Sequence, residues 1–180
     1  MRRGLTRFWF ALVALASAGP ALAASDLAVG KASGLPVPRY VSLKTDRVNL
    51  REGPSKDHRT AWVFTRAGLP VEITAEFETW RRIRDADGTE GWVLHSLLSG
   101  RRTALVMPWA KAGTQPLALR AGPDERSAVV AELQPNVITS VKRCTEGWCR
   151  VVIVLAGARD MTGYMRQDRL WGVYPNEKVE

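Results

Sequence analysis

The sequence predicts an all-β protein made of two tandem small β-barrels that follow an N-terminal signal peptide. Three observations support this prediction: a motif pattern that occurs twice, short strand-like segments separated by turn residues in both copies, and an uncharged apolar run near the N-terminus. Many short strands with frequent turns are typical of small barrels. Helix is not favoured anywhere after residue 23.

The first 23 residues have the three parts of a signal peptide. Three arginines lie among the first seven residues, residues 8–18 carry no charge, and Ala21-Leu22-Ala23 is a small-x-small cleavage site. The apolar run is about half of the ~20 residues that a membrane-spanning helix needs, so an uncleaved anchor is the weaker alternative. We expect cleavage after Ala23, a periplasmic location and no integral membrane segment after cleavage.

Cleavage would leave a moderately basic protein. The chain has 26 Lys and Arg and 18 Asp and Glu; the first 23 residues contain three arginines and no acidic residue, so the mature net charge is +5. Outside the cytoplasm, a positive excess favours anionic envelope polymers or lipid head groups over nucleic acid as partners. A soluble basic surface without a partner is the plainer alternative.

Residues 24–39 separate the signal peptide from the first repeat. They contain two glycines and two prolines in an irregular pattern, which predicts a flexible linker.

The repeat defines two domains. The pattern of residues 49–54 occurs again at residues 118–123, and each copy contains Leu-Arg-x-Gly-Pro. A tryptophan followed two residues later by an arginine comes next in both copies, and a Gly-Trp or Gly-Tyr pair closes them. Because each copy of about 65 residues contains several strand-like segments, we interpret each as a complete domain. The predicted organisation is domain 1 at residues 40–102, domain 2 at residues 103–175 and a tail at residues 176–180.

Strand and turn signals fit this organisation. In residues 71–76, apolar side chains alternate with Glu72, Thr74 and Glu76 in the two-residue period of a half-buried strand. Asp87-Gly88 and Glu146-Gly147 are hairpin turn signals.

The only two cysteines, Cys144 and Cys149, are expected to form one local disulfide in an oxidising compartment. A loop this short contributes only about 2 kcal/mol in the chain-entropy estimate, so the bond would pin a hairpin. Superposing the two repeat tryptophans places Cys144 on Glu76 and Cys149 on Arg81, which predicts that opposite charges hold the same hairpin in the first copy. A two-residue turn that pairs the cysteines also conflicts with the strand alternation, and a bulge would resolve the conflict.

These motifs resemble the bacterial SH3 (SH3b) domain and, more narrowly, the double-domain periplasmic SH3-like proteins of alphaproteobacteria. The resemblance covers residues 40–175. It implies two five-stranded SH3-like barrels of the kind attached to cell-wall hydrolases, where such modules are thought to hold peptidoglycan or its stem peptides. The segments that carry it are 41–44, 48–54, 69–71, 80–84, 87–92 and 99–102 in the first copy, and 119–123, 148–151 and 170–174 in the second.

No catalytic set can be assembled from the sequence. His58 and His95 are the only histidines, and both cysteines are better used in a disulfide. We therefore expect a protein that is not an enzyme and that needs no metal and no cofactor. The favoured function is a non-catalytic envelope module that binds peptidoglycan or wall peptides; the alternatives are an adaptor that binds another envelope protein and a hydrolase using one of the histidines.

Aromatic and basic residues are the candidates for ligand contact. Trp62 and Trp109 have no aromatic counterpart in the other copy, and an indole stacks well on sugar or peptide surfaces. Trp62 is the first choice for an exposed aromatic. Arg51 and Arg59 flank the loop that follows the first repeat motif, and a cleft between adjacent barrels is a favoured place for a ligand. For the repeated tryptophans, a packing role is the stronger interpretation.

Overall fold

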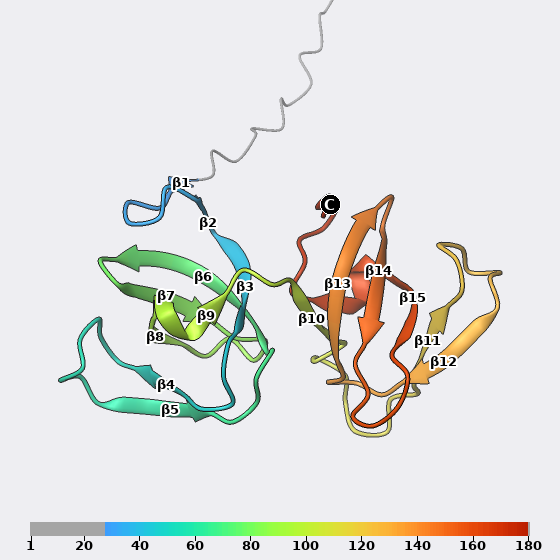
Figure 1. The fold of residues 1–180 in the computed structure, drawn as a ribbon, viewed down its shortest axis with the longest axis horizontal. Helices are drawn as coiled ribbons and strands as arrows, with labels where there is room; N and C mark the ends of the chain where they lie inside the picture. Colours follow the sequence, from blue (N-terminus) through green and yellow to red (C-terminus); the bar gives the residue numbers. More distant parts are fainter. Residues whose placement is uncertain (1–27, 180) are drawn as a thin grey trace, which may run out of the picture.

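The computed structural model describes residues 28–179, and they form two β-domains that lie side by side (Figure 1). The signal peptide and residues 24–27 lie outside the described residues. Within residues 28–179, no helix has the length and apolar character needed to cross a membrane. The prediction of an all-β fold with two tandem small domains is confirmed.

Domain 1 is a seven-stranded antiparallel sheet in the order β5-β4-β8-β7-β6-β3-β9. Its elements are β3 (Arg39–Leu43), β4 (Val48–Arg51), β5 (Thr60–Phe64), β6 (Pro70–Phe77), β7 (Trp80–Arg84), β8 (Glu90–Leu94), a 3-10 turn (His95–Leu97) and β9 (Leu98–Ser99).

Domain 2 repeats this topology in the order β12-β11-β15-β14-β13-β10-β16. Each sheet has seven strands where the resemblance implies five, and the seven include the two-residue β9 and β16. The elements of domain 2 are β10 (Thr103–Val106), β11 (Leu117–Arg120), β12 (Val129–Leu133), β13 (Ile138–Thr145), β14 (Trp148–Ile153), β15 (Met161–Arg166), a 3-10 turn (Gln167–Arg169) and β16 (Leu170–Trp171).

Each domain has its own apolar core. Leu50 of β4 and Ile83 of β7 are fully buried in domain 1, and Leu119 of β11 and Val151 of β14 lie in the equivalent places in domain 2. The repeated Leu-Arg motif is therefore a packing motif: its leucine enters the core of each domain.

The predicted disulfide between Cys144 and Cys149 is confirmed. The two residues pair across the β13–β14 hairpin, which turns at Glu146 and Gly147, and the strand register shifts between Val141 and Arg143. This bulge resolves the conflict between a two-residue turn and the strand alternation.

In domain 1 the same hairpin is held by charge. Glu76 pairs with Arg81 across β6 and β7, and Arg81 Nε lies 3.3 Å from Glu76 Oε1. The strand predicted at residues 71–76 is present as β6, yet Glu72 and Glu76 are not solvated as the alternation implies. Their side chains are only 3% and 1% exposed, because domain 2 covers Glu72 and an N-terminal hairpin covers Glu76.

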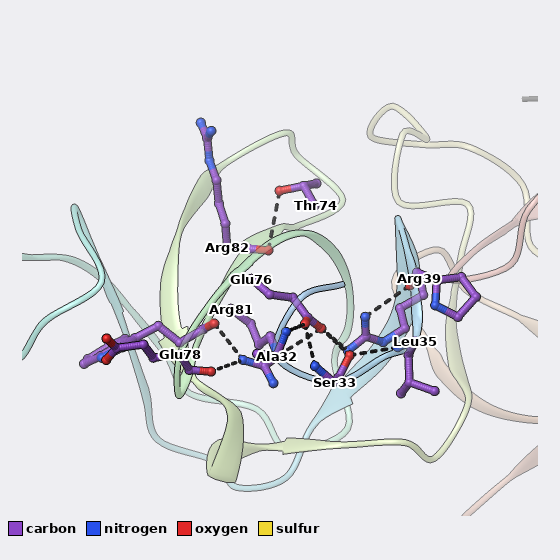
Figure 2. Close-up of polar contacts among 11 residues, drawn as sticks. Ala32, Ser33, Leu35, Arg39, Thr74, Glu76, Glu78, Arg81 and Arg82 are labelled. Atoms are coloured by element: carbon purple, nitrogen blue, oxygen red, sulfur yellow. Dashed lines mark hydrogen bonds and ion pairs between the residues drawn. The ribbon is translucent and has the colours of Figure 1, made fainter. Parts of the chain in front are cut away.

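That N-terminal hairpin consists of β1 (Ala28–Val29) and β2 (Pro36–Val37), which differs from the flexible linker expected for residues 24–39. Its loop wraps around the Glu76 carboxylate, as Figure 2 shows. Glu76 Oε2 accepts hydrogen bonds from the amides of Ala32 (3.0 Å) and Ser33 (2.9 Å), and Oε1 accepts from Arg39 Nη2 (2.8 Å).

The C-terminal tail covers the equivalent hairpin of domain 2. Val179 bridges to Cys144 through two backbone hydrogen bonds of 3.0 and 3.3 Å. Each end of the described chain thus covers one of the two equivalent hairpins. The tail expected at residues 176–180 is, through Val179, a paired part of the domain.

We expect the contact between the N-terminal hairpin and Glu76 to be lost in acid. Burial opposes ionisation of Glu76, but hydrogen bonds from Ser33 and Arg39 outweigh it and lower the pKa from 4.5 to about 2. Because the folded pKa is depressed, the stabilisation is complete above pH 4.5 and disappears as the pH falls toward 2. At ~1.4 kcal/mol per pKa unit, about 3 kcal/mol is lost.

The amide proton shifts of Ala32 and Ser33 report this titration directly, since both amides donate to the Glu76 carboxylate. Their titration midpoint should lie near pH 2. In Glu76→Gln, which has no carboxyl to titrate, the transition should vanish from this range. A midpoint near 4.5, the ordinary value, would show that the carboxylate is not held as described.

Candidate functional site

The two domains dock through a cluster of aromatic rings around a buried carboxylate. The Tyr40 ring in β3 packs edge-on against Trp171 of β16, with centroids 5.3 Å apart, and lies 4.6 Å from the Tyr174 ring. Tyr174 Oη donates a hydrogen bond of 2.8 Å to Glu72 Oε1 in β6, and Arg84 Nε donates one of 2.9 Å to Glu72 Oε2. Burial and the Glu72 carboxylate together raise the pKa of both tyrosines, which therefore stay neutral donors.

A cleft of about 360 Å³ opens at the same junction. One wall comes from β5, where the Trp62 indole is 58% exposed, and from the turn after β7, which carries Asp85 and Asp87. Domain 2 contributes Leu105 and Pro108. The structure therefore places Trp62, the favoured aromatic from the sequence, at the mouth of a cleft formed by both domains.

The walls of this cleft offer an aromatic face, apolar surface and carboxyl groups. Asp85 Oδ1 accepts hydrogen bonds from the amides of Asp87 (3.0 Å) and Thr89 (2.8 Å), which fixes the turn. Burial raises the pKa of Asp85 in spite of these bonds. Asp87 remains exposed at the rim. A volume of about 360 Å³ and this mixture of groups are typical of small ligand sites.

The other candidate residues lie on different surfaces. Trp109 is 54% exposed and lines a separate cleft of about 450 Å³ with Tyr40 and Trp171. Arg51 lines a groove of about 300 Å³ on domain 1. Arg59 forms an ion pair with Glu52, and its side chain is 76% exposed, so the pair contributes little to stability. The four binding candidates therefore do not converge on one site.

The sequence did not point to the residues that dock the domains. Tyr40 and Tyr174 lie near opposite ends of the described chain, and Glu72 has the position of a solvated residue in an alternating strand. No local pattern marks such residues, because their contacts join segments from two different domains.

The fold and the clefts define a protein of two tandem small β-barrels with several open clefts on its surface. The family model described as the bacterial SH3 domain matches residues 44–100 and 113–172, one match in each domain. The chain therefore belongs to the bacterial SH3 domain family. No curated protein matches it.

Two solved structures are similar to the chain at low identity. They are NlpC2 from Trichomonas vaginalis, at 13% identity over 74% of this chain and 48% of that chain, and NlpC1 from the same organism, at 15% identity over 84% and 51%. Both have a TM-score of 0.32. The chain spans about half the length of each.

Proposed function

We propose that this chain is an exported, non-catalytic binding protein of the periplasm that holds peptidoglycan or wall peptides in the junction cleft. We also propose that it is of the double-domain type known from alphaproteobacteria. Membership of the bacterial SH3 family supports a role in the cell envelope, since modules of this kind accompany cell-wall hydrolases.

The observation that carries the proposal is the position of Trp62. Its indole is more than half exposed beside Phe64 and Pro70, and residues of both domains complete the cleft. Exposed indoles stack on sugar rings and on peptide planes, and their N–H donates a hydrogen bond. The Asp85 and Asp87 carboxyl groups add acceptors for the amides and amines of a wall peptide.

Two further features support export and the absence of catalysis. The disulfide between Cys144 and Cys149 is suited to an oxidising compartment and leaves neither thiol available as a nucleophile. The signal peptide predicted at residues 1–23 would take the chain to the periplasm.

Sedimentation with purified sacculi tests this function. We expect the disulfide-intact mature protein, residues 24–180, to be retained on peptidoglycan at raised salt, and Trp62→Ala to reduce retention by about tenfold or more, which corresponds to the ~1.4 kcal/mol or greater loss expected for a stacked aromatic contact. Phe77→Ala is the matched control: Phe77 is an exposed aromatic of the same domain that does not line the cleft.

Equal retention of Trp62→Ala and Phe77→Ala would contradict the assignment of the cleft. Absence of retention for the unmodified mature protein would overturn wall binding as a whole.

The edge of domain 2 supports a second function, an adaptor for another envelope protein. β12 is the terminal strand of its sheet, and Val129 and Val130 on it are exposed. An unpaired edge strand with apolar side chains can accept a strand from a partner. Specific co-purification of an envelope protein without retention on sacculi would favour this function.

A further inference from the structure

Each domain has a groove beside an equivalent loop, which joins β4 to β5 in domain 1 and β11 to β12 in domain 2. The first groove, about 300 Å³, lies on domain 1 against Arg51 and Trp80; the second groove, about 400 Å³, lies on domain 2 against Arg120 and Trp148. The strand registers show that the two are equivalent. Trp80 pairs with Leu94 as Trp148 pairs with Arg166, and a register shift precedes both arginines.

The arginine holds the loop in both domains. Arg51 Nη1 donates to the backbone oxygens of Lys56 (3.0 Å) and His58 (2.7 Å), and Arg120 Nη1 donates to that of Ser127 (3.0 Å). The loops have the same length, so Lys56 and Glu125 both follow the arginine by five residues. The two grooves thus carry opposite charges at this loop position.

In the second groove, a carboxylate of the protein itself neutralises the arginine. Glu125 Oε2 lies 3.3 Å from Arg120 Nη2, and Glu125 Oε1 lies 3.7 Å from Arg166 Nη1. Asp168 pairs in turn with Arg166 at 3.0 Å and with Arg169 at 3.7 Å. Each of the three arginines of this groove thus lies within ion-pair distance of one of two carboxylates from the same domain.

Among residues 28–179, no Asp or Glu lines the first groove. Arg47, Arg51 and Lys56 line it, and none of the three forms an ion pair with any of residues 28–179. The Nη2 of Arg51, whose counterpart in Arg120 faces Glu125, makes no hydrogen bond within that part of the chain. Leu94 and Leu97 stand where the second groove has arginines, so the wall beside the cations is apolar.

We propose that the first groove binds a carboxylate side chain or terminus of a peptide ligand. Glu125 shows the arrangement in the other domain: a carboxylate on a short aliphatic stem, placed against the arginine beside the tryptophan. An incoming peptide carboxylate would accept from Arg51 Nη2 and meet Lys56 and Arg47, while its stem lies on Trp80 and the apolar wall. A charge-assisted hydrogen bond between an arginine and a carboxylate is about twice as strong as a hydrogen bond between neutral groups.

This site is separate from the junction cleft and does not depend on it. The first groove contains none of the residues that line the cleft. If Trp62→Ala does not affect retention on peptidoglycan, the proposal for the first groove still stands. If the glutamate peptide does not bind in the first groove, the proposal for the junction cleft still stands.

The test is an NMR titration of ¹⁵N-labelled mature protein, residues 24–180, with the blocked peptide acetyl-Glu-Glu-Glu-amide. We expect shifts of the backbone amides of Asn49, Arg51 and Lys56 and none at Arg120 or Glu125. The peptide acetyl-Gln-Gln-Gln-amide, which has no charge, should leave these amides unmoved. Inorganic phosphate should bind at least tenfold more weakly than the glutamate peptide.

Two reciprocal variants exchange the charges at the equivalent loop positions of the two grooves. Lys56→Glu gives the first groove the acid of the second and should weaken binding of the glutamate peptide at least tenfold. Glu125→Lys removes the internal carboxylate from Arg120 and should create new shifts at Arg120. Both positions lie in exposed loops, so unchanged amide spectra elsewhere should verify the fold of each variant.

Four results would overturn the proposal. The first is the absence of shifts at Asn49, Arg51 and Lys56 with the glutamate peptide. The others are equal shifts with the glutamine peptide, equal affinity for phosphate, and undiminished binding by Lys56→Glu in a variant whose spectrum shows the native fold.

Discussion

Replacing Gly91 by alanine is expected to lower the free energy of unfolding of domain 1 by about 2 kcal/mol, as is usual for overpacking of a core. A Cβ at this position would lie 2.6 Å from Leu50 Cγ and 2.8 Å from the backbone oxygen of Arg51. The leucine side chain can shift, but the backbone oxygen cannot move away without breaking the pairing of β4 with β8. Urea unfolding of the mature protein measures the loss.

The second domain provides an independent repetition of this experiment. A Cβ at Gly163 would lie 2.6 Å from Leu119 Cγ and 2.7 Å from the backbone oxygen of Arg120, so Gly163→Ala should destabilise domain 2 by a similar amount. Gly100→Ala is the control, since no heavy atom lies within 4 Å of the added Cβ. It should change stability by less than about 0.5 kcal/mol. Equal effects at Gly91 and Gly100 would contradict the close approach of β4 and β8.

These glycines illustrate what the repeat made predictable. The sequence placed Gly91 and Gly163 at equivalent points, and the structure gives the reason: the two strands approach too closely there for a side chain. The same comparison predicted that Glu76 and Arg81 hold in domain 1 the hairpin that the disulfide holds in domain 2. A duplicated sequence reveals such features because each copy repeats the local constraints of one fold.

Contacts between domains could not be predicted in this way. Glu72 and Glu76 have the alternating pattern of solvated residues, and only the position of domain 2 and of the N-terminal hairpin buries them. Similarly, Arg51 and Arg59 are equivalent in the sequence as basic loop residues. The structure separates them, because Arg59 pairs with Glu52 while Arg51 faces a groove without an acid.

Glu72→Ala is expected to release the two domains from each other. The carboxylate accepts from both Tyr174 Oη and Arg84 Nε, so its removal leaves a part-buried tyrosine hydroxyl without an acceptor. A lost hydrogen bond to a charged group costs about 1.5–3 kcal/mol. The Arg84 side chain is 43% exposed and can be hydrated, which keeps the expected total at about 2 kcal/mol rather than the larger cost of a fully buried broken pair.

NMR relaxation gives the most direct measurement of this release, because it reports whether the two domains tumble as one body. We expect a single correlation time for the unmodified mature protein and separate, shorter ones for the domains of Glu72→Ala. Tyr174→Phe keeps the aromatic packing against Tyr40 and loses only the hydrogen bond, so its effect should be smaller.

Glu72→Ala also tests whether the proposed function depends on the junction between the two domains. The cleft beside Trp62 has walls from both domains, whereas the first groove belongs to domain 1 alone. Glu72→Ala should therefore reduce retention on peptidoglycan while leaving binding of the glutamate peptide at Arg51 unchanged. A variant whose domains tumble separately but whose retention is undiminished would show that wall binding needs only one domain, and that the junction cleft is not its site.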